Sequence, residues 1–377
     1  MKPRRVAAVA RKEFLHVLRD PRSLGMGIAI PMLMLVLFGY ALTLDVDNVA
    51  MIVWDQNQTA LSRELISRFD GSRYFSVRDY VRDYRDLQWQ IDSGRAMVAL
   101  VIPTEFAAQV NTGRVAPVQL IVDGSDANTA TIAIGYADAI AQKFSQDLTA
   151  QQIAGRGGPV PRIPLEMRPR VWFNPELQSK NYIIPGLIAV IMMVIAALLT
   201  SLTIAREWER GTMEQLIATP VQGGELILGK LVPYFAIGML DVLLAVLMGE
   251  YVFHVPLRGS VALVFGMASI FLVGTLAMGM LISIVLKNQL LASQVAMVAT
   301  FLPAFLLSGF MFSIANMPKP IQIATHIIPA RYFIALLRGI YLKGVGLEIL
   351  AGQAALLTVY AVIMVALANA KFRKKLI

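Results

Sequence analysis

The chain contains no cysteine among its 377 residues, which excludes disulfide bonds and thiol chemistry. Histidine is scarce as well, and the three residues His16, His254 and His326 stand far apart in the sequence, so a histidine metal cluster is not expected. Charged residues make up only 16% of the chain, against about 25% in typical soluble domains. Hydrophobic residues make up 56%, and the mean hydropathy is +0.61. This composition indicates an integral membrane protein.

Long uncharged segments recur along the chain. At about 1.5 Å per residue, a helix of about 20 residues crosses a hydrocarbon core of roughly 30 Å. Five runs contain no charged side chain, and they cover residues 23–44, 181–204, 259–286, 288–318 and 349–370. A sixth run, 231–253, is interrupted only by Asp241 and Glu250. We therefore predict six transmembrane helices.

The distribution of basic residues predicts the orientation of these helices. The first 22 residues contain seven of them: Lys2, Arg4, Arg5, Arg11, Lys12, Arg19 and Arg22. The C-terminal tail adds Lys371, Arg373, Lys374 and Lys375. By the positive-inside rule both termini are cytoplasmic, in agreement with an even number of spans. The net charge of +9 thus reflects membrane orientation and contact with anionic lipids, and no nucleic-acid partner is expected.

Residues 45–180 form the one sizeable polar segment, and the predicted topology places it outside the cytoplasm. Hydrophobic periodicity and turn residues predict four strands, at 49–55, 75–81, 96–103 and 117–125. Between and after them we expect helices at 59–69, 83–93, 104–113 (with Thr104 as its cap) and 128–152, followed by an irregular connector at 155–164. This alternation predicts a small α/β domain inserted between transmembrane helices 1 and 2.

Several aspartates of this segment could suggest a cation site: Asp45, Asp47, Asp55, Asp123 and Asp126. Their positions at strand ends and turns favour helix capping and loop solvation, and the spacing of a Ca²⁺-binding loop is missing. We expect no metal in this domain.

Residues 205–230 form a hinge with charges of both signs between two apolar runs. Such a mixture favours docking of another protein over anchoring in lipid. Residues 224–230 also match G-x-x-x-x-G-K, but Leu231 stands where a nucleotide-binding loop needs a hydroxyl for Mg²⁺, and no buried strand precedes the motif. We therefore expect no ATP site here and no bound cofactor, so any ATP and Mg²⁺ chemistry belongs to another polypeptide.

Residues 4–20 predict a basic amphipathic helix lying in the inner membrane interface. Its apolar side is expected to carry Val6, Ala10, Phe14, Val17 and Leu18, and its opposite side Arg5, Lys12 and Arg19. Pro21 would then turn the chain into the first span. Glu13 falls near the apolar side, where a lone carboxylate is costly, so we expect it to have a cationic partner from the cytosolic loop.

Two features of the later spans are candidates for function. The fifth span carries small residues at a spacing of four: Ala292, Ala296, Thr300, Ala304 and Ser308. This stripe lets another helix approach closely, either from the same chain or from a second subunit. Thr275, Gly279 and Ser283 form a shorter stripe in the fourth span. Asp241, inside the third span, is a candidate pathway residue or a hydrogen-bonded structural one.

Four strings carry a resemblance to a known family. They are RKEFLHVLRDPRS (11–23), WFNPELQSKNYIIPG (172–186), AREWERGTMEQLIATP (205–220) and LLSGFMFSIANMPKPIQIATHIIPARYFIALLRG (306–339). The chain resembles, over essentially its full length, the ABC-2 class of ATP-binding-cassette exporter permeases. The long segment between spans one and two is similar to that of a bacterial multidrug subgroup with a large periplasmic domain.

The resemblance implies a permease that moves drugs or other amphipathic small molecules outward across a bacterial inner membrane. It implies a coupling helix that docks on an ATP-binding cassette subunit, with this role falling on Arg206, Glu207, Glu209, Arg210, Gly211, Thr212 and Glu214. It also implies a connecting helix that includes Glu13, Phe14 and Arg19, and an outer re-entrant segment at 313–340. The expected partners are the ATPase, a second permease subunit (identical or homologous) and a periplasmic adaptor protein.

The resulting layout has three parts: residues 1–44 with the connecting helix and helix 1, residues 45–180 as the periplasmic domain, and residues 181–377 with helices 2–6 and the coupling loop 205–230. Two other functions stay open. An ion-coupled secondary carrier would use Asp241 and need no ATPase, although no inverted repeat is evident. A ligand-binding membrane sensor would be expected to carry a cytosolic output domain, and we find no such segment.

Overall fold

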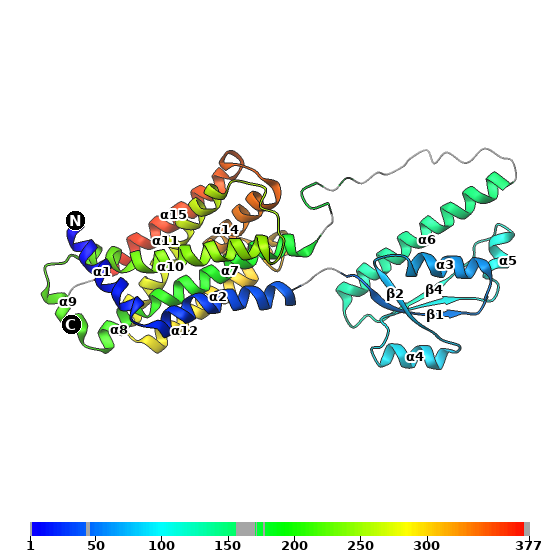
Figure 1. Cartoon of the computed structure of the whole chain (residues 1–377), viewed down its shortest axis with the longest axis horizontal. Helices are drawn as coiled ribbons and strands as arrows, with labels where there is room; N and C mark the ends of the chain where they lie inside the picture. The colour runs from blue at the N-terminus through cyan, green and yellow to red at the C-terminus, as the bar shows by residue number, and fades with distance from the viewer. Residues whose placement is uncertain (1, 43–45, 156–169, 171, 176–177, 373–377) are drawn as a thin grey trace. The chain divides into compact units, whose positions relative to one another are not determined.

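The computed structural model describes residues 2–42, 46–155, 170, 172–175 and 178–372. The chain divides into two compact units, one formed by Met1–Thr43 with Arg170–Ile377 and the other by Leu44–Pro169. Figure 1 shows the first as a helical bundle and the second as a sheet with helices. From residue 156 onward, the expected connector 155–164 lies outside the described residues.

The helical unit begins with α1 (Pro3–Leu18), and Pro21 then opens α2 (Pro21–Ala41). After the second unit, the chain returns through α7 (Ser179–Ser201), α8 (Thr203–Glu209), α9 (Thr212–Ala218), α10 (Gly223–Tyr251), α11 (Val261–Leu286) and α12 (Gln289–Leu302). The π-helical turn η1 (Pro303–Leu307) extends α12. The remaining elements are η2 (Ile314–Asn316), α13 (Lys319–Ala324), η3 (Thr325–Ile327), α14 (Pro329–Arg338), η4 (Gly339–Lys343) and α15 (Leu347–Lys371).

Five helices in the described chain are long and apolar enough to cross a membrane: α7 continued by α8, α10, α11, α12 continued by η1, and α15. They coincide with five of the six predicted runs. The first run falls on α2, whose apolar part, Gly27–Ala41, is shorter. A further pair, Lys319–Ile327 and Pro329–Lys343, is bent by 88° and is either a broken span or a re-entrant loop. The protein is therefore mostly helical with five or six candidate spans, and our count of six stays a prediction.

Helix α7 forms the centre of this unit. Its residues are apolar on all sides, as expected for a helix surrounded by others, and nearly all of its side chains from Ile183 to Ala197 are buried. The neighbours α2, α10, α11, α12 and α14 pack around it. Helix α15, by contrast, packs mainly on α11 and leaves much of its apolar surface exposed.

Both stripes of small residues are used for packing within this chain. In α11, Gly279 lies against Ala197 and Thr200 of α7, where an added Cβ would find no room. Thr200 Oγ1 also donates to the Leu276 carbonyl at 2.8 Å. In α12 the whole predicted stripe is buried, and the helix packs on α7, α8 and α11. Small side chains permit such close approach, so the chain's own helices account for both stripes.

The second unit is an α/β fold built on a four-stranded sheet. Its elements are β1 (Val49–Asp55), α3 (Ala60–Asp70), β2 (Phe75–Tyr80), α4 (Tyr84–Asp92), β3 (Val98–Ile102), α5 (Phe106–Asn111), β4 (Gln119–Val122) and α6 (Ala127–Gly155). The strand order is β2-β1-β3-β4, in which β1 is parallel to both neighbours and β4 is antiparallel to β3. Helices α3, α5 and α6 bury one face of the sheet, and α4 covers the other.

Each predicted strand and helix of this unit is present, with ends displaced by a few residues. The predicted Thr104 cap is wrong, because α5 starts after Glu105 and has no side-chain cap. Three of the aspartates serve turns and caps. Asp55 Oδ1 accepts from the Asn57 and Gln58 amides at 3.0 Å each, Asp123 Oδ1 accepts from the Ser125 amide at 2.9 Å, and Asp126 accepts from amides at the start of α6. Asp47 instead lies 3.9 Å from Arg73 Nε, and Asp45 lies outside the described residues. Within the described residues, no group of three or more potential metal ligands occurs.

Candidate functional site: a buried ion cluster behind the charged hinge

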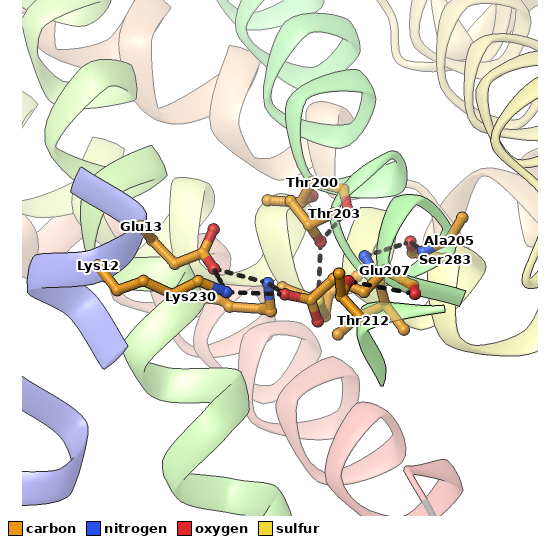
Figure 2. Close-up of polar contacts among 11 residues, drawn as sticks. Lys12, Glu13, Thr200, Thr203, Ala205, Glu207, Thr212, Lys230 and Ser283 are labelled. Carbon is orange, nitrogen blue, oxygen red and sulfur yellow. Dashed lines mark hydrogen bonds and ion pairs between the residues drawn. The ribbon is translucent and has the colours of Figure 1, made fainter. Parts of the chain in front are cut away.

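A cluster of four charged side chains joins three helices of the helical unit. Lys230 Nζ lies 2.9 Å from Glu13 Oε1 and 2.8 Å from Glu207 Oε1. Lys12 Nζ reaches the same two carboxylates at 3.4 Å and 3.3 Å. Figure 2 shows these side chains pointing toward one another from α1, α8 and α10. With two ammonium and two carboxylate groups, the ion cluster has no net charge.

Three members of the ion cluster are almost completely buried: Lys230 is 1% exposed, Glu13 4% and Glu207 7%. Burying a charge is costly unless it is paired and hydrogen-bonded. The cationic partner expected for Glu13 is thus confirmed as Lys230, at the end of the charged hinge. In the sequence, Lys230 ends the hinge 205–230 and completes the rejected nucleotide motif, but neither pattern identified it as the partner of Glu13.

The local sequence explains how α1 reaches the cluster. Val9, Glu13 and Val17 repeat every four residues, and they are the buried side chains of α1. Opposite Val9 stands Gly229, where an added Cβ would come within 2.6 Å of the Val9 Cβ. The absence of a side chain at Gly229 therefore brings α1 close to α10 directly beside Lys230.

The apolar side predicted for α1 differs from the side that packs on the protein. Phe14 is 46% exposed and Leu18 is 51% exposed. The packed face shares Val17 with the predicted stripe but is rotated from it, because the approach to α10 selects Val9, Glu13 and Val17. Arg19 is exposed as the residue that ends α1.

The cluster shifts the pKa values of its α1 members. Burial alone would raise the pKa of Glu13, but the ammonium groups of Lys230 and Lys12 outweigh burial and hold this pKa below its usual range. Burial alone would lower the pKa of Lys12, but Glu207 and Glu13 outweigh it and raise this pKa. Both shifts favour the charged forms of Glu13 and Lys12.

A second polar contact fixes the start of α1. Glu225, in the first turn of α10, is fully buried. Its Oε1 accepts from the backbone amide of Lys2 at 2.7 Å, and its Oε2 accepts from the amide of Gln222 at 2.9 Å. Helix α1 is therefore attached to α10 at both Glu225 and Lys230.

The residues assigned to the coupling helix do not form one uniform surface. Glu207 points into the ion cluster, and Glu209 Oε1 accepts from the Gln289 amide at 2.8 Å at the start of α12. Arg206 is half-buried, and its Nε lies 3.4 Å from Gln289 Oε1. Glu209, the last residue of α8, is exposed, and so are the four assigned residues that follow it: Arg210, Gly211, Thr212 and Glu214.

The turn between α8 and α9 gives this exposed surface its shape. Gly211 has a φ of +68°, in the left-handed region that glycine adopts without strain. Met213 then points inward and is 1% exposed, which seats α9 on the bundle. Two buried groups therefore hold the exposed turn on the bundle. One is Met213, and the other is the ion cluster, through Glu207 one helical turn earlier in the chain.

A cavity of about 420 Å³ lies between this turn and the ion cluster. Lys12, Arg206 and Arg210 line it, together with Glu207 and Thr212. Glu207 Oε2 is buried and has no hydrogen-bond partner among the described residues.

The nucleotide-like motif has no phosphate-binding conformation. Residues 224–230 lie inside the continuous helix α10, and Lys230 is occupied by two carboxylates. A phosphate-binding loop instead presents successive backbone amides and a free lysine to the nucleotide. This geometry supports the rejection of the motif.

Asp241 stands apart from the cluster, further along α10. It is 1% exposed, and neither of its carboxylate oxygens has a hydrogen-bond partner within the described part of the chain. Its helix neighbours Gly238, Val242 and Ala245 are buried as well. A structural role for Asp241 would need a hydrogen-bond partner, and the described residues supply none.

Comparison with known proteins identifies the family. The pattern of ABC-2 family transporter proteins matches residues 21–369. The chain belongs to this ABC-2 family. It is 39% identical to the probable multidrug ABC transporter permease YbhS of Escherichia coli K12, over 99% of this chain and 98% of that protein. It is 31% identical to the probable multidrug ABC transporter permease YbhR of the same organism, over 98% and 99%.

A third relative is the inner membrane transport permease YhhJ of Escherichia coli K12, which is 27% identical over 87% of this chain and 86% of that protein. The family resemblance expected from the four strings is thus confirmed, and it extends over nearly the whole chain. The described helices agree with a multi-pass membrane protein of this family.

Proposed function

We propose that this ABC-2 protein is the membrane subunit of an ATP-driven exporter that moves drugs or other amphipathic small molecules outward across a bacterial inner membrane. The observation that carries the proposal is the exposed turn at Arg210–Glu214, which is backed by the buried ion cluster. An exposed charged turn with a rigid base suits the transmission of force from a partner. The printed names of YbhS, YbhR and YhhJ support the same class of function.

In this proposal a separate ATP-binding cassette subunit binds ATP and Mg²⁺ and docks on the turn between α8 and α9. Both termini and the coupling loop 205–230 are cytoplasmic, because the basic residues at the two ends of the chain mark the cytoplasmic side of the membrane. The α/β unit and the bent segment 313–340 are then periplasmic. A second permease subunit and a periplasmic adaptor protein complete the assembly and rest on the family resemblance alone.

Charge reversal in the exposed turn tests the docking site. Arg210→Glu and Glu214→Lys change side chains that face solvent and leave the ion cluster intact. We expect loss of ATPase co-purification and of efflux, with normal amounts of permease in the membrane. Lys319→Glu, at an exposed position on α13, is the matched control. Unchanged co-purification and efflux in both hinge variants would contradict the assignment.

Glu209 needs separate treatment, because it caps the start of α12 as well as lying in the hinge. A reversal at Glu209 would perturb packing and docking together, so it cannot distinguish them. Glu209→Gln retains an acceptor for the Gln289 amide and removes the charge. If this variant transports normally, the role of Glu209 is structural.

An ion-coupled carrier is the second candidate, and the buried, unpartnered carboxylate of Asp241 is the observation that favours it. Transport in proteoliposomes, with ATP and an ion gradient supplied separately, distinguishes the two functions. For the exporter we expect ATP-dependent transport that survives Asp241→Asn, with altered selectivity. Transport driven by the gradient alone, and abolished by Asp241→Asn, would establish the carrier.

A further inference from the structure

A polar cavity of about 350 Å³ lies beside the bent segment, far in sequence from the ion cluster. Its walls come from the first turn of α7, the two residues after η1, and the segments η2, η3, α14 and α15. Arg331, Arg338 and His326 supply its basic groups, and Tyr182 and Ser313 supply hydroxyl groups. No aspartate or glutamate lines the cavity in the described structure.

Arg338 is held in a fixed position by neutral groups. Its guanidinium carbon lies 3.4 Å from the ring centre of Tyr182, and Nη1 donates to the Gly309 carbonyl at 2.9 Å. Nη2 donates to the Phe310 carbonyl at 3.2 Å, and Nε donates to the Tyr182 carbonyl at 3.3 Å. A guanidinium has five N–H donors, so two remain available. All recorded acceptors are carbonyls, which orient the positive charge without neutralising it.

Arg331 is in a similar situation at the other side of the cavity. Its contacts with Thr325 Oγ1, the Gln322 carbonyl (3.3 Å) and His326 Nδ1 (3.1 Å) all use Nη1. Among the described residues, neither Arg331 nor Arg338 forms an ion pair with a carboxylate. Two half-buried guanidinium groups therefore face one cavity with their charge uncompensated.

We propose that this cavity binds the anionic group of an amphipathic molecule, a phosphate or a carboxylate, between Arg331 and Arg338. Arginine is suited to these groups because its planar fork donates two parallel hydrogen bonds. Apolar residues, among them Ile314, Ile334 and Leu356, also line the cavity and can contact the attached apolar part. The volume is in the range of sites that bind small molecules, about 300–1,000 Å³.

Binding to the purified full-length chain in an uncharged detergent tests this site. The probes are dihexanoylphosphatidylglycerol (anionic), dihexanoylphosphatidylcholine (zwitterionic) and inorganic phosphate, each followed by titration calorimetry. We expect the anionic lipid to bind, with an affinity that falls as salt is added, and the zwitterionic lipid to bind at least about tenfold more weakly. Competition by inorganic phosphate would identify a free anion as a sufficient ligand, and its failure would identify a headgroup attached to apolar chains.

The variants distinguish this cavity from general attraction to anions. Arg331→Gln should weaken binding of the anionic lipid at least about tenfold, and Arg331→Lys should recover part of the affinity. Lys319→Gln removes the same charge from an exposed position on the neighbouring α13 and should have no effect. The binding of Arg338→Gln must be compared with its melting temperature, because Arg338 also donates to three backbone carbonyls and its loss can destabilise the fold. Equal binding of both lipids, or unchanged binding in Arg331→Gln, would overturn the proposal.

Discussion

Removing the central ammonium of the ion cluster should release α1 from the bundle. Lys230→Met keeps most of the side-chain volume but leaves Glu13 and Glu207 with only one cation, Lys12, whose side chain is 57% exposed. Breaking a buried ion pair by removing one partner costs about 3–5 kcal/mol. Because Lys12 still compensates part of the negative charge, we take the lower value, about 3 kcal/mol, which corresponds to roughly a hundredfold change in the docking equilibrium of α1.

Hydrogen exchange of the α1 backbone amides measures this equilibrium, since local opening controls exchange. We expect exchange in α1 to be roughly a hundredfold faster in Lys230→Met than in the unchanged protein. Amides in the central part of α7 should keep their protection. Lys371→Met, at an exposed position near the end of α15, is the matched control for removing a lysine.

A triple variant separates lost charge balance from lost packing. Glu13→Gln, Glu207→Gln and Lys230→Met together remove the three buried charges, and replacing a whole buried ionic group is often nearly neutral. Exchange in the triple variant should therefore return most of the way toward the unchanged protein. If Lys230→Met alone leaves exchange in α1 unchanged, the cluster does not anchor this helix and our reasoning is wrong.

Three further predictions concern the same region and the topology. Gly229→Ala should separate α1 from α10 and lower the melting temperature, because the added Cβ would meet Val9, whereas Gly266→Ala has no atom within 4 Å and should be silent. Because the pKa of Glu13 is depressed in the folded protein, its contribution to the stability of α1 docking is complete above the ordinary pKa of 4.5 and is lost as the pH falls below that value. Hydrogen exchange of the α1 amides should therefore accelerate only in that acid range. Because the chain has no native cysteine, single cysteines at Val122 and Ala218 can be labelled directly; an impermeant maleimide added to spheroplasts should reach only the first, and the opposite result would invert the proposed orientation.

Local sequence signals were sufficient for the α/β unit. Each strand is a short apolar or alternating run, and turn residues such as Gly71, Gly94 and Gly113 separate the elements. The direction of β4 could not be predicted in this way. Strand pairing is a long-range property, and β4 joins β3 antiparallel after the short α5, whereas the earlier strands are parallel.

The candidate site was only partly accessible from the sequence. A lone carboxylate among apolar residues predicts that Glu13 needs a cation, but that cation, Lys230, is 217 residues away. A lone lysine at the start of an apolar run is a matching signal that could have suggested the pair. The coupling role was assigned to seven residues between Arg206 and Glu214 without regard to the side of the helix, whereas helical geometry turns Glu207 inward and leaves Arg210 exposed.

These contacts determine how the hinge can move when a partner acts on it. Helix α8 is joined to α10 and α1 through Glu207, and to the start of α12 through Glu209. It is also joined to α11, because Ser283 Oγ accepts from the buried amides of Ile204 and Ala205 at 3.0 Å and 2.9 Å. Separating α8 from α10 would expose or strand buried charges, at a cost of about 3–5 kcal/mol. Moving α8, α10 and α1 as one body would keep these ion pairs intact, whereas the exposed carboxylate of Glu209 can exchange its hydrogen bonds with water at lower cost. We therefore infer that a push on the exposed turn leaves α8 attached to α10 and α11 through these buried contacts, and that the exposed contact of Glu209 with α12 gives way first.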